Sequence, residues 1–210
     1  MGNFFTENNL VEITGEHFII DMMYATPQNI TMHPVYQEVG FGNHAYLHKD
    51  AAQKLATIEP FLHQHNLKMR IRDAYRPPLA HQRILEILPV KGLFASRPEN
   101  SLHCYGVAID CCLTDINGKD LIYPTAIDAY APQYAEQISH GKVDEFYQHF
   151  AKAASDFYAP GYEQAVANRQ QLRELMLNAG FEGIHDEWWH FQLPDGKALY
   201  PLVEWKNISD

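Results

Sequence analysis

The chain has 210 residues, of which 46% are hydrophobic and 20% charged, the composition of an ordinary globular domain with its own core. Its formal net charge of −10 argues against nucleic acid or an anionic membrane surface as a partner. No apolar run approaches the roughly 20 residues that a membrane-spanning helix needs, so we expect no membrane partner.

The first predicted helix covers residues 50–64, with Asp50 as its N-cap and Pro60 expected to kink or shorten it. Its apolar residues share one helical stripe: Ala51, Leu55, Ile58 and Leu62. Alternating apolar side chains predict a strand over residues 68–75, which Pro77 and Pro78 end. Residues 79–88 then fit a short helix.

Residues 106–113 (GVAIDCCL) form a short apolar run typical of a central strand, with Asp110 as its one carboxylate. The pair Asn117-Gly118 predicts a hairpin turn, with residues 121–123 as the return strand. Residues 131–158 are polar and compatible with a helix.

The clearest helix covers residues 163–179, where apolar side chains repeat at helical spacing and Gly180 stands where a left-handed cap belongs. Residues 188–193 (WWHFQL) predict a strand that the turn at residues 194–196 ends. Together these elements predict an α+β fold, a single domain over residues 1–210 with a small, mostly antiparallel sheet and helices packed around it.

Three cysteines, Cys104, Cys111 and Cys112, are an odd number with two adjacent members, which argues against a disulfide framework. We interpret Cys111 and Cys112 as small apolar residues of a buried strand, with thiolate metal ligands as the alternative. A reducing compartment fits best, and residues 1–24 show no signal peptide, so we expect a cytoplasmic protein. A periplasmic protein whose signal peptide has been removed would look the same.

The first cluster with chemistry contains His103 and Asp110. A carboxylate inside an apolar strand is costly to bury unless it is paired or binds a metal. The seven-residue separation of His103 and Asp110 spans about 23 Å in a strand and about 10 Å along a helix. Zinc needs both donor atoms within about 2.2 Å of the ion. The chain must therefore bend between them, and Gly106 permits the bend. A satisfied core pair of His and Asp is the commoner alternative.

The second cluster is residues 186–190 (DEWWH). If the strand begins at Trp188, His190 shares a face with Trp188 and Gln192, and Glu187 lies at the irregular strand entrance. A Glu three residues from a His can place a base beside a metal-activated water, although an exposed Glu on an edge strand is commoner. Both clusters together supply two histidines and one carboxylate and leave a fourth position open, as in catalytic zinc sites.

The third cluster surrounds Arg76, which follows the strand at residues 68–75 and precedes Pro77. A guanidinium at this position can point into a pocket and bind a developing oxyanion or a substrate carboxylate. The alternatives are a surface arginine or one that pairs with Asp73.

These clusters, in this order, resemble the zinc D-alanyl-D-alanine dipeptidases, including the vancomycin-resistance type. Their superfamily also holds zinc D,D-carboxypeptidases, phage endolysins and the hedgehog signalling domain. The superfamily pattern falls on Ser101, His103, Asp110, Glu187, Trp189 and His190. The dipeptidase branch adds matches at Tyr24-Ala25-Thr26 with Asn29, Tyr75-Arg76-Pro77, Asn168-Arg169, Leu172 and Gly180-Phe181-Glu182. The resemblance covers about residues 21–193.

The resemblance implies one zinc ion per chain with the ligands His103, Asp110 and His190. It further implies that Glu187 is the general base and acid and that Arg76 stabilises the tetrahedral intermediate. Its implied substrate-binding residues are Ser101, Asp128 and Tyr24.

Between Asp120 and Tyr162 the chain departs from the family pattern and is longer than usual. Tyr123-Pro124-Thr125 stands where the family has Met-Gly-Ser or Met-Gly-Thr. We therefore expect a lengthened helical insertion at residues 129–160.

The expected activity is zinc-dependent hydrolysis of a small D,D-dipeptide of cell-wall (peptidoglycan) metabolism, D-Ala-D-Ala. One alternative is a D,D-carboxypeptidase or muropeptide peptidase that acts on longer cell-wall stems. Another is a non-catalytic zinc-bearing binding module. Glu187 and Arg76 count against the binding module, because a binder needs neither.

Overall fold

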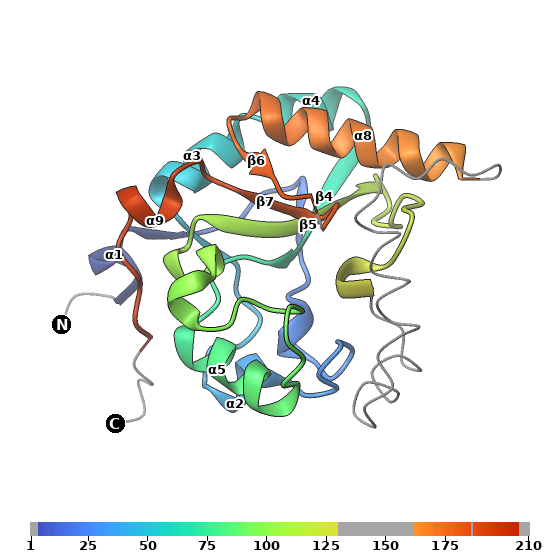
Figure 1. Ribbon diagram of the computed structural model, residues 1–210. Coiled ribbons are helices and arrows are strands. Elements are labelled where there is room, and N and C mark those ends of the chain that lie inside the picture. Colours follow the sequence, from blue (N-terminus) through green and yellow to red (C-terminus); the bar gives the residue numbers. More distant parts are fainter. Residues whose placement is uncertain (1–3, 130–161, 186, 206–210) are drawn as a thin grey trace.

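The computed structural model describes residues 4–129, 162–185 and 187–205 (Figure 1). The helix-compatible segment at residues 131–158 and the expected insertion at 129–160, apart from Ala129, lie outside these residues. Within the described part of the chain, no helix is both long and apolar enough to span a bilayer.

A five-stranded sheet forms the centre of the fold. Its strands in spatial order are β2 (Phe18–Ile20), β4 (Leu67–Asp73), β5 (Ala108–Asp115), β7 (His190–Gln192) and β6 (Glu182–Gly183). β2 and β4 run parallel, and the other neighbours run antiparallel. The predicted α+β class with a mostly antiparallel sheet is confirmed, and β5 is the central strand. A separate antiparallel pair consists of β1 (Leu10–Glu12) and β3 (Tyr46–His48).

Helices cover both faces of this sheet (Figure 1). On one face lie α3 (Lys49–Ala56), α4 (Glu59–Gln64) and α8 (Glu163–Asn178), and on the other lie α2 (Val35–Glu38) and α5 (Pro78–Ile87). The shorter helical pieces are α1 (Phe4–Glu7), η1 (Met23–Ala25), η2 (Pro98–Asn100), η3 (Leu102–Tyr105), η4 (Ile127–Ala129) and α9 (Gly196–Leu199).

The predicted helix at residues 50–64 is two helices, α3 and α4. Pro60 has no N–H with which to continue the helix, and it stands in the first turn of α4, where none is needed. The predicted N-cap was wrong, because the His48 side chain accepts a hydrogen bond from the backbone N–H of Asp50 at 3.3 Å. The predicted apolar stripe is buried in both helices.

The helix predicted at residues 163–179 is confirmed as α8. Gly180 follows it with a φ of 87° and donates its N–H to the Leu177 carbonyl at 2.9 Å. Phe181 donates to the Met176 carbonyl at 3.1 Å, which completes a Schellman cap. The strand at residues 68–75 and the helix at 79–88 are also confirmed, as β4 and α5.

Two strand predictions needed correction. The Asn117-Gly118 turn forms, but residues 121–123 are no return strand, since the pairing is a single bridge between Thr114 and Asp120. The strand predicted from Trp188 begins only at His190, and Trp188 lies in a turn. Its indole N–H donates to Thr125 Oγ1 at 3.0 Å, and its ring stacks on that of Tyr123 at 4.1 Å between centroids. These contacts hold Trp188 outside the strand, so the expected shared face with His190 does not exist.

All three cysteines are free and buried, as expected. Cys111 and Cys112 lie on β5, and Cys104 lies in η3. Burial raises the pKa of both the Cys104 and the Cys112 thiol to about 12. These groups are therefore neutral thiols at physiological pH, which supports the interpretation as small core residues.

Candidate metal centre and substrate pocket

The bend that brings the first cluster together lies at Gly106. η3 ends there with a φ of 68°, in the left-handed region that favours glycine, and β5 begins two residues later. A Cβ at this position would come within 2.7 Å of the Leu10 side chain and 3.2 Å of the His48 backbone nitrogen. Both the turn and the close approach of β3 therefore require glycine, as the spacing of His103 and Asp110 predicts.

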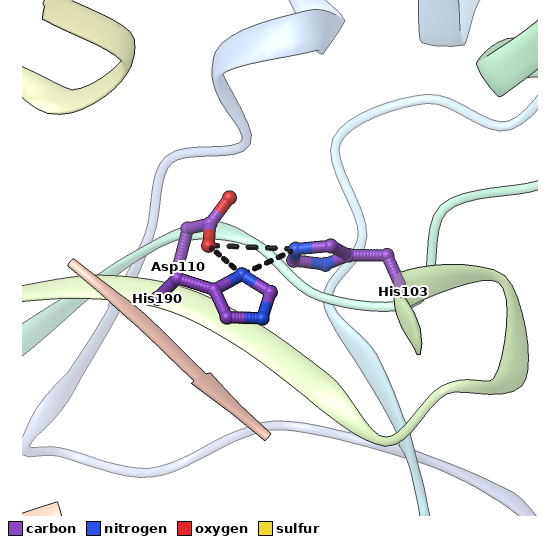
Figure 2. Close-up of side chains that lie close together, drawn as sticks. All are labelled: His103, Asp110 and His190. Carbon is purple, nitrogen blue, oxygen red and sulfur yellow. Dashed lines mark hydrogen bonds and ion pairs between the residues drawn. The ribbon is translucent and has the colours of Figure 1, made fainter. Parts of the chain in front are cut away.

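The structure brings His103, Asp110 and His190 together from three elements (Figure 2). Asp110 and His190 are register partners on the adjacent strands β5 and β7, and His103 reaches them from η3. Asp110 Oδ1 lies 3.0 Å from His190 Nδ1 and 3.4 Å from His103 Nε2, and the two nitrogens are 3.2 Å apart. All three residues are buried, and one ligand atom from each lies within 4.8 Å of the others.

Hydrogen bonds on the outer sides of both imidazoles determine which nitrogen faces the cluster. His103 Nδ1–H donates to the Ala74 carbonyl at 2.8 Å, and His190 Nε2–H donates to Gln192 Oε1 at 3.1 Å. The Gln192 amide nitrogen in turn donates to Glu182 Oε1 at 2.9 Å, which orients the amide. These bonds direct His103 Nε2 and His190 Nδ1 toward Asp110, and in the neutral imidazoles both nitrogens would be free to bind a metal ion, as the outer partners of metal-bound histidines ensure.

This donor set fits a divalent metal ion. Burial would raise the pKa of Asp110, but His103 and His190 lower it below its ordinary range, so the group is an anion at neutral pH. Two imidazole nitrogens and one carboxylate oxygen are a common ligand set of catalytic zinc, which keeps a further position open. Among the residues that the structure describes, no other group of three such ligands was found.

Glu187 lies beside this cluster, with Oε2 3.6 Å from His190 Nδ1. Withdrawal from solvent raises the pKa of Glu187 to about 8; His190 opposes the rise, and the charges of Asp110 and Asp128 add to it. A carboxyl group with a pKa near neutrality can both take up and release a proton, which suits general acid–base catalysis.

Arg76 is only 5% exposed and lies on the pocket. Its Nε and Nη2 donate to Asp73 Oδ2 at 2.8 and 2.6 Å. Its guanidinium carbon lies 5.2 Å from the centre of the Tyr24 ring and 5.7 Å from that of Phe94. The pairing with Asp73 is present, but the alternative of a surface arginine was wrong.

The three expected substrate-binding residues lie in different places. Ser101 and Asp128 line the pocket, whereas Tyr24 is fully buried and donates its hydroxyl hydrogen to Asp128 Oδ2. Tyr24 thus holds Asp128 and is not on the pocket wall. Asp128 has a φ of 52°, and burial, with the charge of Asp110, raises its pKa to about 6.

One pocket of about 310 Å³ contains all of these groups except Tyr24. Sequence reasoning missed several residues of its lining: Phe94, Asn100, Gln192 and Lys197. Gln192 stands two positions after His190, and the sequence placed it on the same strand face but gave it no role in the site. The other three lie in irregular segments or a short helix, where no periodicity points to them.

Comparison with known proteins gives three matches. The family of D-ala-D-ala dipeptidases matches residues 141–207, a segment that contains Glu187 and His190. A D-alanyl-D-alanine dipeptidase of Escherichia coli (strain K12) is 32% identical over 185 residues, covering 88% of this chain and 82% of the relative. A D-alanyl-D-alanine dipeptidase of Enterococcus faecium is 26% identical over 185 residues, covering 83% of this chain and 85% of the relative.

Proposed function

Because this chain belongs to the family of D-alanyl-D-alanine dipeptidases, we propose that it hydrolyses the dipeptide D-Ala-D-Ala with the aid of one zinc ion. The observation that carries the proposal is the convergence of His103, Asp110 and His190 beside Glu187 in one pocket. The pocket volume of about 310 Å³ is at the low end for ligand sites, which suits a small substrate.

His103 Nε2, His190 Nδ1 and a carboxylate oxygen of Asp110 would hold the zinc ion. When bound there, zinc supplies a Lewis acid that polarises the scissile carbonyl and acidifies water. The outer hydrogen bonds to Ala74 and Gln192 keep both imidazoles in the required tautomer.

Glu187 handles the protons of the reaction. Its carboxylate takes a proton from the attacking water and delivers it to the nitrogen of the leaving D-alanine. Its place beside His190 and on the pocket wall gives it access to both groups.

Arg76 offers N–H donors to the oxygen that becomes negatively charged in the tetrahedral intermediate. Asp73 holds two of its nitrogens, so the guanidinium does not have to reorganise during the reaction. This interaction stabilises the transition state more than the bound substrate, so it raises kcat.

Asp128 and Ser101 would bind the two ends of the dipeptide. Asp128 is largely ionised at pH 7, because its pKa is about 6, and a carboxylate on the pocket wall attracts the free ammonium group of a dipeptide. Ser101, beside His103 on the same wall, would bind the other end. Because D-Ala-D-Ala is a peptidoglycan precursor, the activity belongs to cell-wall metabolism, and three free cysteines support a cytoplasmic location.

The test is hydrolysis of four substrates by the zinc-loaded protein: D-Ala-D-Ala, L-Ala-D-Ala, N-acetyl-D-Ala-D-Ala and a pentapeptide stem. We expect D-Ala-D-Ala to be cleaved with the highest kcat/KM, and the acetylated form to be a poor substrate because it has no ammonium group. Preference for the stem or the acetylated dipeptide would make the protein a D,D-carboxypeptidase or muropeptide peptidase. No hydrolysis of any substrate would favour a zinc-bearing binding module.

A further inference from the structure

A histidine outside the metal centre, His81, contacts the pocket arginine Arg76. His81 lies on α5 and is fully buried. Its Nδ1 is 3.3 Å from Arg76 Nη1, and its Nε2 is 2.7 Å from the carbonyl oxygen of Ala95. Ala95 belongs to the loop whose residues Leu93 and Phe94 also line the pocket.

The two neighbours of His81 determine its protonation. A carbonyl oxygen can only accept, so Nε2 must carry the hydrogen and donate it to Ala95. A guanidinium can only donate, so Nδ1 must be the lone-pair acceptor for Arg76. Both contacts therefore require the same neutral tautomer. Burial, followed by the charge of Arg76, lowers the pKa of His81 to about 4, which agrees with a neutral ring.

The donors of Arg76 are divided between two acceptors. A guanidinium has five N–H groups; Asp73 takes two of them and His81 takes one, which leaves two for other partners. Asp73 is itself held in place, because Tyr36 and the backbone N–H of Ala74 donate to its other oxygen.

The choice of a neutral acceptor has an electrostatic consequence. Three carboxyl groups already line the pocket, those of Asp110, Asp128 and Glu187. A second carboxylate against Arg76 would add a further negative charge near the developing oxyanion and weaken the field that stabilises it. A neutral imidazole satisfies Nη1 without that charge.

We propose that His81 is a positioning residue for Arg76, which fixes the guanidinium through Nδ1 and links it through Nε2 to the pocket loop at Ala95. This inference rests on the proposed function, in which Arg76 stabilises the oxyanion. It predicts that the hydrogen bond to Arg76, and not the volume of the ring, is what catalysis needs.

Three substitutions separate these roles. His81→Leu introduces an apolar side chain of similar size, so it fills the space of the ring but removes both hydrogen bonds. His81→Asn places an amide oxygen where the ring has Nδ1, so it keeps the acceptor for Arg76. His81→Gln reaches the position of Nε2, so it keeps the donor to Ala95 alone.

We expect kcat for D-Ala-D-Ala to fall about tenfold or more in the Leu and Gln variants, with KM nearly unchanged. His81→Asn should recover most of the lost kcat. In an Arg76→Ala background, His81→Leu should cause no further loss, because its effect acts through Arg76. Equal kcat in the Asn and Leu variants, or a full tenfold loss in the Arg76→Ala background, would overturn the proposal.

A measurement without turnover keeps this test separate from the proposed function. ¹⁵N NMR of the imidazole nitrogens, assigned by the signal missing in His81→Asn, should show a neutral Nε2–H tautomer at pH 7. That result supports the positioning contact even if the protein cleaves none of the four substrates. A charged ring or an Nδ1–H tautomer would contradict it, whatever the activity.

Discussion

The polar atoms on the metal side of the pocket and those on the arginine side are arranged in opposite ways. On the metal side, His103 Nε2, His190 Nδ1 and Asp110 Oδ1 face one another as three potential metal-ligand atoms within a few ångströms (Figure 2). On the arginine side, the donors of Arg76 meet acceptors of the protein, Asp73 and His81. Ligand atoms that converge in this way can bind a cation. A donor that acceptors of the protein itself hold in place is already oriented before the reaction begins.

The largest effect should come from the metal side. Replacing His103, Asp110 or His190 with Ala should remove the bound zinc and lower kcat on the order of 10⁴-fold, because several kcal/mol of transition-state stabilisation go with the metal. Metal content per chain by elemental analysis checks this. His17→Ala is the control, a buried histidine outside the pocket that should keep full zinc. Full zinc in two of the three ligand variants would disprove the site.

The next effect should come from Glu187, which lies beside His190 on the pocket wall. Glu187→Gln should keep one zinc per chain while kcat falls on the order of 10³-fold, because the amide cannot take up the proton. Steady-state kinetics measure the loss of kcat, and metal analysis of the same sample measures the zinc content per chain. Glu86→Gln is the matched control, since the exposed Glu86 carboxylate pairs with Arg83 and is not part of the pocket lining. Loss of zinc in the Glu187 variant would make this residue a ligand instead of the base.

A smaller effect is expected on the arginine side, where zinc should be retained. Arg76→Ala should lower kcat about a hundredfold with little change in KM, the usual result of losing one preorganised oxyanion donor. Arg76→Lys should recover only part of the rate, because a point charge cannot reproduce the planar fork that Asp73 and His81 hold. If KM rises instead and kcat stays constant, Arg76 binds the ground-state carboxylate.

The smallest effect should be a pH dependence of substrate binding at Asp128. Its pKa of about 6 is above the usual value, so the carboxylate is charged at pH 7 and loses its charge as the pH falls through 6. KM for D-Ala-D-Ala should therefore rise about tenfold between pH 7 and pH 5, a range in which both ends of the dipeptide stay charged. Asp128→Asn should have a high KM that changes little with pH. The same pH dependence in this variant would exclude Asp128 as the ammonium site.

The metal side could be predicted from the sequence because its signals are local. Asp110 interrupts an apolar strand, and Gly106 stands where the bend must be. Each of these follows from the cost of burying a charge or from the backbone freedom of glycine.

The rest of the site depends on contacts between residues distant in the chain. Trp188 leaves the predicted strand because Thr125 and Tyr123 hold it, 63 and 65 positions earlier (188 minus 125 and 188 minus 123). A histidine on the buried face of α5 looks in sequence like any core residue, so nothing pointed to the contact between His81 and Arg76.

Removal and return of the metal test the central claim most directly. The full chain is stripped with a chelator, zinc is added back in fractions of one equivalent, and release of D-alanine from D-Ala-D-Ala is measured at each step. The proposed site predicts no activity in the stripped protein and a linear rise that ends at one zinc per chain. Full activity in the stripped protein, or a rise that ends at two zinc ions per chain, would contradict it.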